Sequence, residues 1–127
     1  MFSPSYVLLY VEDPAVSAAF YAPLLGREPI AAGPTFVLFA LDHGMMLGLW
    51  SRREVEPAVV AGGGAGELAI EVKDAATVAA MHADWCRRGL AIAQPPTRMD
   101  FGSTFVALDP DRHRLRVFAP AAAGAAP

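Results

Sequence analysis

The sequence is poor in cysteine and has no long apolar run. Its 127 residues include one cysteine, Cys86, so no disulfide can form within the chain, as is usual for proteins of a reducing compartment. No apolar stretch approaches the roughly 20 residues of a membrane-spanning helix. The segment before Glu12 carries no basic leader, so no signal peptide is expected. We therefore expect a cytoplasmic protein that does not enter a membrane.

A basic surface is also missing from the sequence. The formal net charge is -3, and the arginines form isolated pairs, such as Arg52-Arg53 and Arg87-Arg88, rather than a stripe. Nucleic acid is therefore not an expected partner. A hydrophobic fraction of 54% and a charged fraction of 18% are typical of a globular chain, and the length fits a single domain.

The first half of the chain predicts the order strand, helix, strand, strand, strand. Residues 6–11 (YVLLYV) favour a short strand. Asp13-Pro14 is a helix start signal, and Gly26 ends the helix. Within this helix, one face is expected to enter the core, namely Val16, Ala19, Phe20 and Leu24. Three strands separated by turn residues are expected to follow at 28–32, 35–41 and 45–50.

The second half predicts the same order after a linker. Residues 52–66 turn polar and end in GGGAG, which is typical of a flexible connection. Residues 67–72 (ELAIEV) alternate as a strand, and a helix is expected from Asp74 to Arg88. Three shorter strands should follow, with a long turn-rich loop at 94–102 between the first two of them; they are 91–93, 104–108 and 115–118.

The two halves share residues at matching positions. An offset of 61 superposes Val11 on Val72 and Asp13 on Asp74, and an offset of 69 superposes Thr35-Phe36-Val37 on Thr104-Phe105-Val106. The prediction is an α+β fold of two βαβββ modules whose mixed sheets form a curved cup. One domain is expected throughout, with parts at 5–51 (module one), 52–66 (linker), 67–119 (module two) and 120–127 (frayed tail).

Strand alternation separates a helix-facing side from an open side in each module. Leu68, Ile70 and Val72 are expected to pack on the helix, and Val7, Leu9 and Val11 occupy matching positions. The opposite, open side then carries large aromatic side chains with a few polar ones: Tyr6, Tyr10, Met46, Trp50, Glu67, Arg116 and Phe118. Such a surface suits a flat ligand, a partner subunit, or both.

These segments resemble a known superfamily. YVEDPAVSAAFYAPLLGREP is similar to the first strand and helix of the vicinal oxygen chelate superfamily, which includes glyoxalases, extradiol dioxygenases and bleomycin-resistance proteins. ELAIEVKD and LDPDRHRLRVF resemble strands of its second module. The likeness covers residues 6–119 and implies the fold, but the fold alone does not imply an activity.

The resemblance implies four metal-ligand positions, which fall on Tyr6, Gly48, Glu67 and Arg116. Of these, Glu67 is the one with metal-binding chemistry, because glycine has no side chain and arginine stays protonated. We therefore expect no metal and no other cofactor. Glu67 and Arg116 either pair with each other or stand as separate solvated side chains.

Within the superfamily, the chain resembles most the metal-free phenazine-antibiotic resistance proteins, which bind a flat drug in a dimer-interface cavity. LGLWS, with Trp50, and MDFGSTFVALDPDRHRLRVFAP, with Phe101, carry this likeness. The resemblance implies a homodimer that sequesters a planar aromatic antibiotic or toxin without catalysis. The predicted ligand-binding residues are Tyr6, Tyr10, Met46, Trp50, Glu67, Phe101, Arg116 and Phe118.

Two enzyme hypotheses and a structural one remain beside this. A metal-free lyase or isomerase could use Glu67 as a base, and a glyoxalase- or dioxygenase-type enzyme would need a metal. Alternatively, the open side only forms a dimer. The histidines, His43, His82 and His113, are expected on the surface, and Cys86 half-buried on its helix.

Overall fold

The chain divides into two compact units, residues 1–63 and 64–127. The computed structural model describes residues 4–56, 58 and 66–121. No helix in this described part is long and apolar enough to span a membrane. Residues 57 and 59–65 of the expected linker, and 122–127 of the expected tail, lie outside the described residues. The domain limits expected from the sequence therefore stay predictions.

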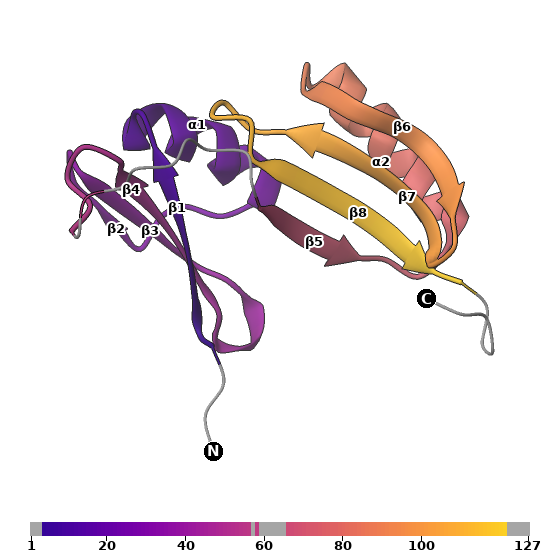
Figure 1. Ribbon diagram of the computed structural model, residues 1–127, viewed down its shortest axis with the longest axis horizontal. Helices are drawn as coiled ribbons and strands as arrows, with labels where there is room; N and C mark the ends of the chain where they lie inside the picture. The colour runs from indigo at the N-terminus through magenta and orange to yellow at the C-terminus, as the bar shows by residue number, and fades with distance from the viewer. Residues whose placement is uncertain (1–3, 57, 59–65, 122–127) are drawn as a thin grey trace. The chain divides into compact units, whose positions relative to one another are not determined.

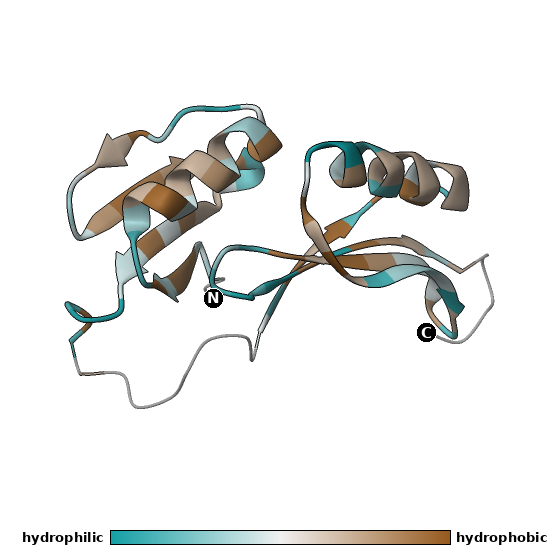
Figure 2. Ribbon diagram, turned by 90° about the horizontal axis from the view of Figure 1, so that it is seen from above, coloured by the Kyte–Doolittle hydropathy of each residue, from teal (hydrophilic) through white to brown (hydrophobic). Residues whose placement is uncertain are grey.

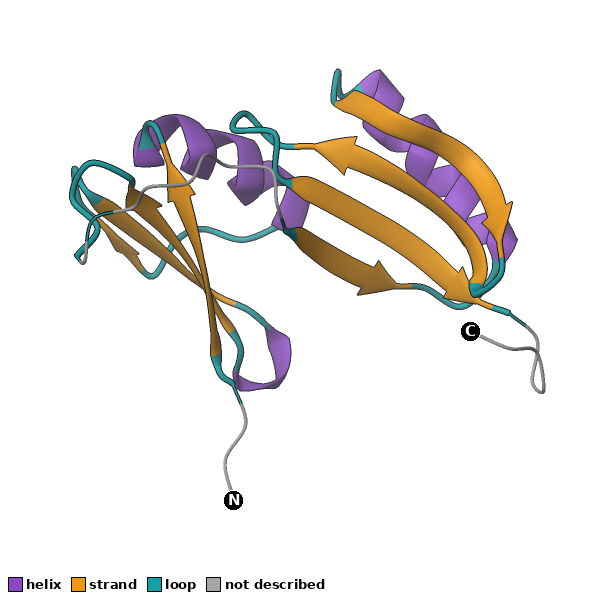
Figure 3. Cartoon of the chain, in the orientation of Figure 1, coloured by secondary structure: helices purple, strands orange, loops and turns teal. Residues whose placement is uncertain are grey.

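The first unit is a four-stranded sheet with one helix (Figures 1 and 3). In the sheet, β1 pairs with β4 in parallel, while β4–β3 and β3–β2 are antiparallel. A short 3₁₀ turn, η1, connects β3 to β4 (Figure 3). The elements are β1 (Tyr6–Val11), α1 (Pro14–Leu25), β2 (Ala31–Ala32), β3 (Phe36–Ala40), η1 (Asp42–Gly44) and β4 (Met46–Ser51).

The second unit repeats this topology. Its strand order is β5-β8-β7-β6, again with one parallel pair, β5 and β8. The elements are β5 (Glu67–Glu71), α2 (Ala75–Arg87), β6 (Ala91–Met99), β7 (Gly102–Leu108) and β8 (Arg114–Pro120). The sequence-based prediction of an α+β fold with two βαβββ modules and mixed sheets is confirmed.

Both helices begin as the sequence predicts. Asp13 precedes α1 and accepts a hydrogen bond from the Ala15 backbone N–H at 3.0 Å. Asp74 precedes α2 and accepts one from the Thr77 N–H at 2.8 Å. Each carboxylate satisfies a donor that the first helical turn leaves free. The two equivalent caps fix where each helix leaves its sheet.

The core of each unit lies between helix and sheet (Figure 2). Alternate residues of the strands, such as Val11, Leu49 and Val117, are fully buried. In the second unit, Trp85 of α2 packs edge-to-face on Phe105, with ring centroids 5.2 Å apart. The predicted alternation of the strands is therefore confirmed, and it leaves the other face of each sheet as the open side.

The predicted buried face of α1 is wrong. Pro14, Ser17 and Tyr21 are buried, whereas Val16 is 53% exposed. Apolar residues occur all around this helix, so the sequence pattern does not identify which face is buried. Ser17 enters the core because a small side chain lets α1 approach the sheet closely.

The strand register corrects the sequence match between the two halves. Phe36 pairs with Trp50 in the first sheet, and Thr104 pairs with Phe118 in the second. Equivalent positions therefore differ by 68 residues (104 − 36 and 118 − 50), not 69. The match of Phe36 to Phe105 is wrong, because a slip of one residue places a side chain on the opposite face.

The loop predicted at 94–102 is mostly strand. β6 continues through Pro95 and Pro96 to Met99, and its pairing with β7 shifts register on either side of Gln94. Proline cannot donate a hydrogen bond, so it is tolerated here because β6 is an edge strand. The sequence-based reasoning took the prolines for a turn.

The expected placements of the histidines and the cysteine need two corrections. His113 is 7% exposed rather than a surface residue, because its ring pairs with the Asp109 carboxylate. Cys86 is exposed rather than half-buried. His43 is exposed, as expected, and His82 is half-buried with its ring against Phe105.

Candidate functional site

An aromatic hollow lies on the open side of the first sheet. Tyr6, Leu8, Phe36 and Trp50 line a volume of about 460 Å³. Tyr6 is 54% exposed and Leu8 42%, and exposed apolar side chains that lie together in one patch are typical of a binding surface. The Trp50 ring stands edge-to-face to Phe36, at 6.2 Å between centroids, and to Tyr10, at 6.3 Å. We call this region the aromatic hollow.

Gly48 provides the space for two of the lining side chains. A Cβ at this position would lie 2.6 Å from Leu8 Cδ2 and 2.8 Å from Phe36 Cζ, both inside van der Waals contact. Leu8 and Leu38 are its neighbours in the register of the sheet. Glycine therefore lets Leu8 and Phe36 lie across the middle of the sheet and form the floor of the aromatic hollow.

Four of the predicted ligand-binding residues belong to this sheet. Tyr6 and Trp50 line the aromatic hollow, and Tyr10 contacts Trp50. Met46 lies beside Tyr6 in the register but is not among the lining residues.

The sequence-based prediction left out two further lining residues, Leu8 and Phe36. Leu8 alternates in phase with Tyr6 and Tyr10 along β1, so strand alternation was sufficient to include it among the lining residues. Because Phe36 was matched to Phe105, the sequence comparison did not indicate that the Phe36 side chain lies on the open side.

The open side of the second sheet carries an ion pair. Arg116 donates from Nε to Glu67 Oε1 at 2.9 Å and from Nη2 to Glu67 Oε2 at 3.0 Å. Arg114 approaches the same carboxylate at 3.8 Å. Of the two alternatives considered from the sequence, pairing is therefore the one observed. The planar fork of arginine matches a carboxylate in this two-bonded geometry.

The third guanidinium nitrogen of Arg116 is also engaged. Its Nη1 donates to Thr104 Oγ1 at 3.2 Å and to Gln94 Oε1 at 3.4 Å. The Thr104 hydroxyl in turn donates to the Val117 carbonyl at 2.9 Å. The sequence-based prediction missed Gln94 and Thr104, because the first was placed in a loop and the second was matched one residue out of register.

Two phenylalanines complete this surface. The Arg116 guanidinium lies 5.8 Å from the centroid of the Phe101 ring. Phe101 meets Phe118 edge-to-face at 6.2 Å. The structure therefore gathers four predicted residues of the second unit, Glu67, Phe101, Arg116 and Phe118, into one connected cluster.

The charge of Glu67 is stabilised by its partner. The hydrogen bonds from Arg116 lower the pKa of Glu67, and they outweigh the effect of burial, which raises it. A carboxylate with a lowered pKa and with both oxygens bonded is a poor proton acceptor. Its place in the structure favours positioning Arg116 over catalysis.

The two open sides differ at two equivalent positions. Phe36 in the first sheet corresponds to Thr104 in the second, and Gly48 corresponds to Arg116. The first pair leaves room between aromatic rings, whereas the second fills the same place with a guanidinium and its hydroxyl acceptor. The same architecture thus carries an apolar hollow in one unit and a polar network in the other.

The residues at the four implied metal positions do not fit a metal. Gly48 offers no ligand atom, Arg116 is a cation, and both Glu67 oxygens are bonded to it. Across the described ranges there is no group of three or more His, Cys, Asp or Glu side chains arranged to hold an ion. A divalent ion needs several converging oxygen, nitrogen or sulfur ligands.

Comparisons with known proteins support the same architecture. A curated relative, the phenazine antibiotic resistance protein EhpR of Enterobacter agglomerans, is 28% identical over 119 residues, covering 91% of this chain and 90% of the relative. The solution structure of an Agrobacterium tumefaciens protein is 50% identical with a TM-score of 0.86, covering 95% of this chain and 99% of that one.

A more distant structure shows the fold alone. A glyoxalase/bleomycin resistance protein/dioxygenase from Nocardioides is 22% identical with a TM-score of 0.82, covering 100% of this chain and 90% of that one. Residues 3–117 match the sequence model of the corresponding family. The chain belongs to the glyoxalase/bleomycin resistance protein/dioxygenase superfamily.

Proposed function

We propose that the protein binds a planar aromatic small molecule and holds it without converting it, which would sequester an antibiotic or toxin. The aromatic hollow carries this proposal. Its lining of Tyr6, Leu8, Phe36 and Trp50 leaves apolar surface in contact with water. Covering such surface with a flat ring system gains roughly 25 cal/mol per Å² of apolar area removed from water.

The ring geometry in the aromatic hollow suits a flat ligand. Trp50 stands nearly perpendicular to Phe36, at 88°, and to Tyr10, at 77°. A ligand that lies against one of these rings therefore meets the edge of another, which is the favoured arrangement between aromatic systems. Ligand pockets of this kind are typically apolar with a few polar groups.

The proposal also assigns ligand contacts to the cluster in the second unit. Phe101 and Phe118 offer ring surface, and the Arg116–Glu67 pair offers a fixed charged edge that would orient a polar substituent. We further propose a homodimer, because a second copy would remove the exposed open sides from water.

The relative from Enterobacter agglomerans supports antibiotic resistance as the biological context. Catalysis by the residues at the implied metal positions finds less support. Glu67 is committed to Arg116, which disfavours its use as a base, and Gly48 removes one implied metal ligand. Among the described residues, neither of these arrangements favours catalysis over binding.

The two tryptophans allow a direct test with phenazine as the probe. Trp85 is buried against Phe105, so Trp85→Phe leaves Trp50 as the fluorophore, and Trp50→Phe is the matched control that keeps Trp85. We expect phenazine to quench the Trp85→Phe variant saturably and the control little. Trp50→Ala should weaken binding about tenfold or more.

Two outcomes would overturn the proposal. One is the absence of saturable quenching in Trp85→Phe while the variant keeps the wild-type melting temperature. The other is recovery of a chemically altered phenazine after incubation with the wild-type protein, which chromatography detects. Decalin, a saturated and non-planar hydrocarbon of two fused rings, serves as the control for the planarity of the ligand.

A further inference from the structure

We propose that the aromatic hollow selects, among planar aromatic molecules, those whose ring system carries a permanent positive charge. This preference rests on the proposed function, because it names the ligand class for the same site. The rings of Tyr6, Phe36 and Trp50 line the aromatic hollow together with Leu8. The face of an aromatic ring carries partial negative charge and attracts a cation that lies within about 6 Å of its centroid.

The rings around the aromatic hollow differ in orientation. Trp50 is nearly perpendicular both to Phe36 and to Tyr10, and its ring centroid lies 6.2 Å and 6.3 Å from theirs. A flat ligand can therefore stack on one ring and still contact another. A charge spread over three fused rings is then near more than one aromatic side chain, which strengthens the attraction.

The described strands of the first sheet place no charged side chain on the open side. Tyr6 pairs with Met46 and Phe36 pairs with Trp50, and alternation from these positions assigns the face. Within these strands, every residue on this face is an aromatic residue, leucine, methionine, glycine or alanine. A cationic ligand therefore meets no competing ammonium or guanidinium group on this face of the strands.

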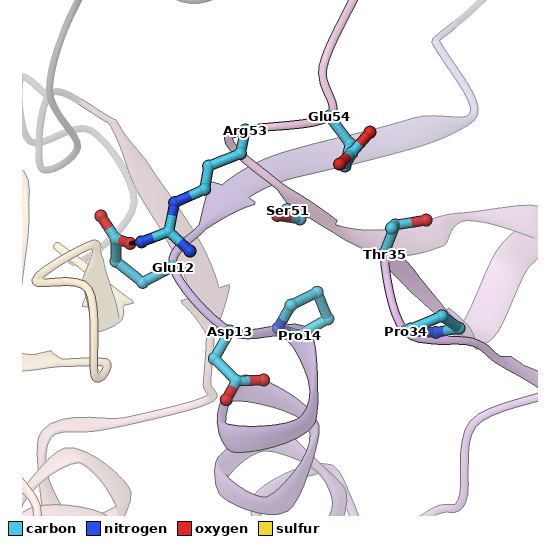
Figure 4. A pocket seen from close by; sticks show the side chains of 8 residues that line it. All are labelled: Glu12, Asp13, Pro14, Pro34, Thr35, Ser51, Arg53 and Glu54. Carbon is cyan, nitrogen blue, oxygen red and sulfur yellow. Dashed lines mark hydrogen bonds and ion pairs between the residues drawn. The ribbon is translucent and has the colours of Figure 1, made fainter.

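The charged side chains beyond the strand ends are held in ion pairs. Arg53 reaches the Glu12 carboxylate at 3.2 Å, as Figure 4 shows, and Arg52 approaches the same carboxylate at 3.6 Å. At the opposite end of the sheet, Arg27 contacts Asp42 at 3.4 Å. Exposed pairs of this kind are screened by water and salt. Their effect on a bound ligand is therefore small beside that of rings in direct contact.

The second unit carries a cation of its own at the equivalent place. In the register, Arg116 is the counterpart of Gly48, and its guanidinium lies 5.8 Å from the centroid of the Phe101 ring. The carboxylate that holds it, Glu67, has Tyr6 as its counterpart. The duplicated frame thus sets a cation beside a ring in the second unit and leaves this part of the first sheet aromatic, so a cation can come from a ligand.

Neutral and anionic ligands of the same shape gain less. A neutral ring system keeps the burial of apolar area but lacks the attraction of a charge to the ring faces. An aromatic carboxylate would lose hydration where the described open-side positions offer as donors the hydroxyls of Tyr6 and Tyr10 and the indole N–H of Trp50. A quaternary ring nitrogen has no N–H group, so its burial leaves no donor unpaired.

Acridine, N-methylacridinium and acridine-9-carboxylate test this preference, because they share a flat three-ring frame and differ in charge. Equilibrium dialysis of the full-length protein at pH 7.5 measures the bound fraction of each ligand by its absorbance. We expect N-methylacridinium to bind about tenfold more tightly than acridine, and the carboxylate about tenfold more weakly. The preference should persist in about 0.5 M salt, which screens the field of the net charge of -3 more than it screens direct contacts.

Two substitutions of Trp50 separate the ring from its apolar volume. In Trp50→Leu, the ratio of the affinities for N-methylacridinium and acridine should fall below about threefold, whereas Trp50→Phe keeps a ring and should retain more of the preference. Trp85→Phe is the matched control, because Trp85 is buried against Phe105 in the second unit. This variant should keep the wild-type ratio.

Three outcomes would overturn the inference. N-methylacridinium binds no more tightly than acridine, the carboxylate binds more tightly than either, or Trp50→Leu leaves the ratio unchanged. If acridine still binds in these cases, the proposed function stands and the charge preference alone is wrong. Binding of none of the three ligands to the wild-type protein would overturn both.

Discussion

Arg116 reaches diagonally across the parallel pair of strands to hold Glu67 by two hydrogen bonds of 2.9 and 3.0 Å. In the register, the residue directly opposite Arg116 is Ala69, so the long guanidinium side chain must lean along the sheet. Its planar fork thereby ties the edge strand β5 to β8.

Removing this carboxylate should weaken the second unit. Glu67→Gln is expected to lower the free energy of unfolding by about 1 kcal/mol at pH 7, a value discounted because Glu67 is 33% exposed. Its pKa is lowered by Arg116. The stabilisation is therefore present above the ordinary value of 4.5 and lost as pH falls through the lowered pKa. Urea unfolding at pH 7 and pH 3 measures both effects.

The matched control for this prediction is Glu71→Gln, an exposed carboxylate on the same face of β5. It should change stability little at either pH. Equal losses in the two variants would mean that the ion pair does not stabilise the sheet.

The buried pair of Asp109 and His113 should make stability fall in alkaline solution. The Asp109 carboxylate lies 2.9 Å from His113 Nδ1 and raises the pKa of His113 against the opposing effect of burial. The stabilisation is complete below the ordinary pKa of 6.5 and is lost as pH rises through the raised value. Urea unfolding between pH 6 and pH 9 should show the fall in wild type and not in His113→Gln. A wild-type profile parallel to that of the variant would contradict this.

The same carboxylate also holds the turn between β7 and β8. Asp109 Oδ1 accepts from the backbone N–H groups of Asp111 and His113, at 2.9 and 2.8 Å. Asp109→Asn keeps the shape but removes the charge, and we expect a loss of about 2 kcal/mol in the free energy of unfolding at pH 6. A loss below about 0.5 kcal/mol would show that the pair is unimportant.

A methyl group at Gly48 should displace two side chains that line the aromatic hollow. Gly48→Ala forces the Leu8 and Phe36 side chains away from positions 2.6 and 2.8 Å from the new Cβ. We expect a loss of about 1–3 kcal/mol in the free energy of unfolding from overpacking. Phenazine affinity should fall as well, in the fluorescence titration described above. Undiminished affinity would show that the ligand does not enter the aromatic hollow.

Gly102 should be the glycine least tolerant of substitution in the second unit. Its φ is +138°, and an added Cβ would collide with the Ala119 carbonyl oxygen. Gly102→Ala is expected to cost about 3 kcal/mol or more. Gly89→Ala is the matched control: φ is +84° and nothing lies within 4 Å, so about 1 kcal/mol is expected. Urea unfolding compares them, and similar costs would contradict the packing argument.

Purified protein should carry no stoichiometric divalent metal. Gly48 and Arg116 occupy implied ligand positions, and neither can bind a cation. Mass-spectrometric metal analysis measures the content, and chelator treatment should leave the melting temperature unchanged. A stoichiometric ion that survives gel filtration would refute this prediction and reopen metal-dependent catalysis.

Local sequence signals were sufficient for the framework of the fold. Asp13 and Asp74 marked the helix starts because capping uses only neighbouring residues. The alternation in β5 and β8 assigned Glu67 and Arg116 to one face before any pairing was known. These signals fail where the environment is set by distant strands, as at Pro95-Pro96, whose strand character depends on pairing with β7.

The candidate site was predicted in part for a related reason. Tyr6, Tyr10 and Trp50 lie on the predicted face and contact one another or a common hollow. Phe36 was missed because sequence identity favoured an offset of 69, and only the strand register distinguishes it from 68. The burial of His113 likewise depends on Asp109, which a pattern of single residues does not reveal.

The two prolines of β6 have a consequence for how the protein behaves at high concentration. β6 is an outer strand of its sheet, and an exposed strand edge can recruit another chain through its free N–H groups. Pro95 and Pro96 have no N–H group to offer. The breaks in pairing on either side of Gln94 further interrupt the regular ladder along this edge. This edge is therefore protected against strand-by-strand aggregation by its own sequence.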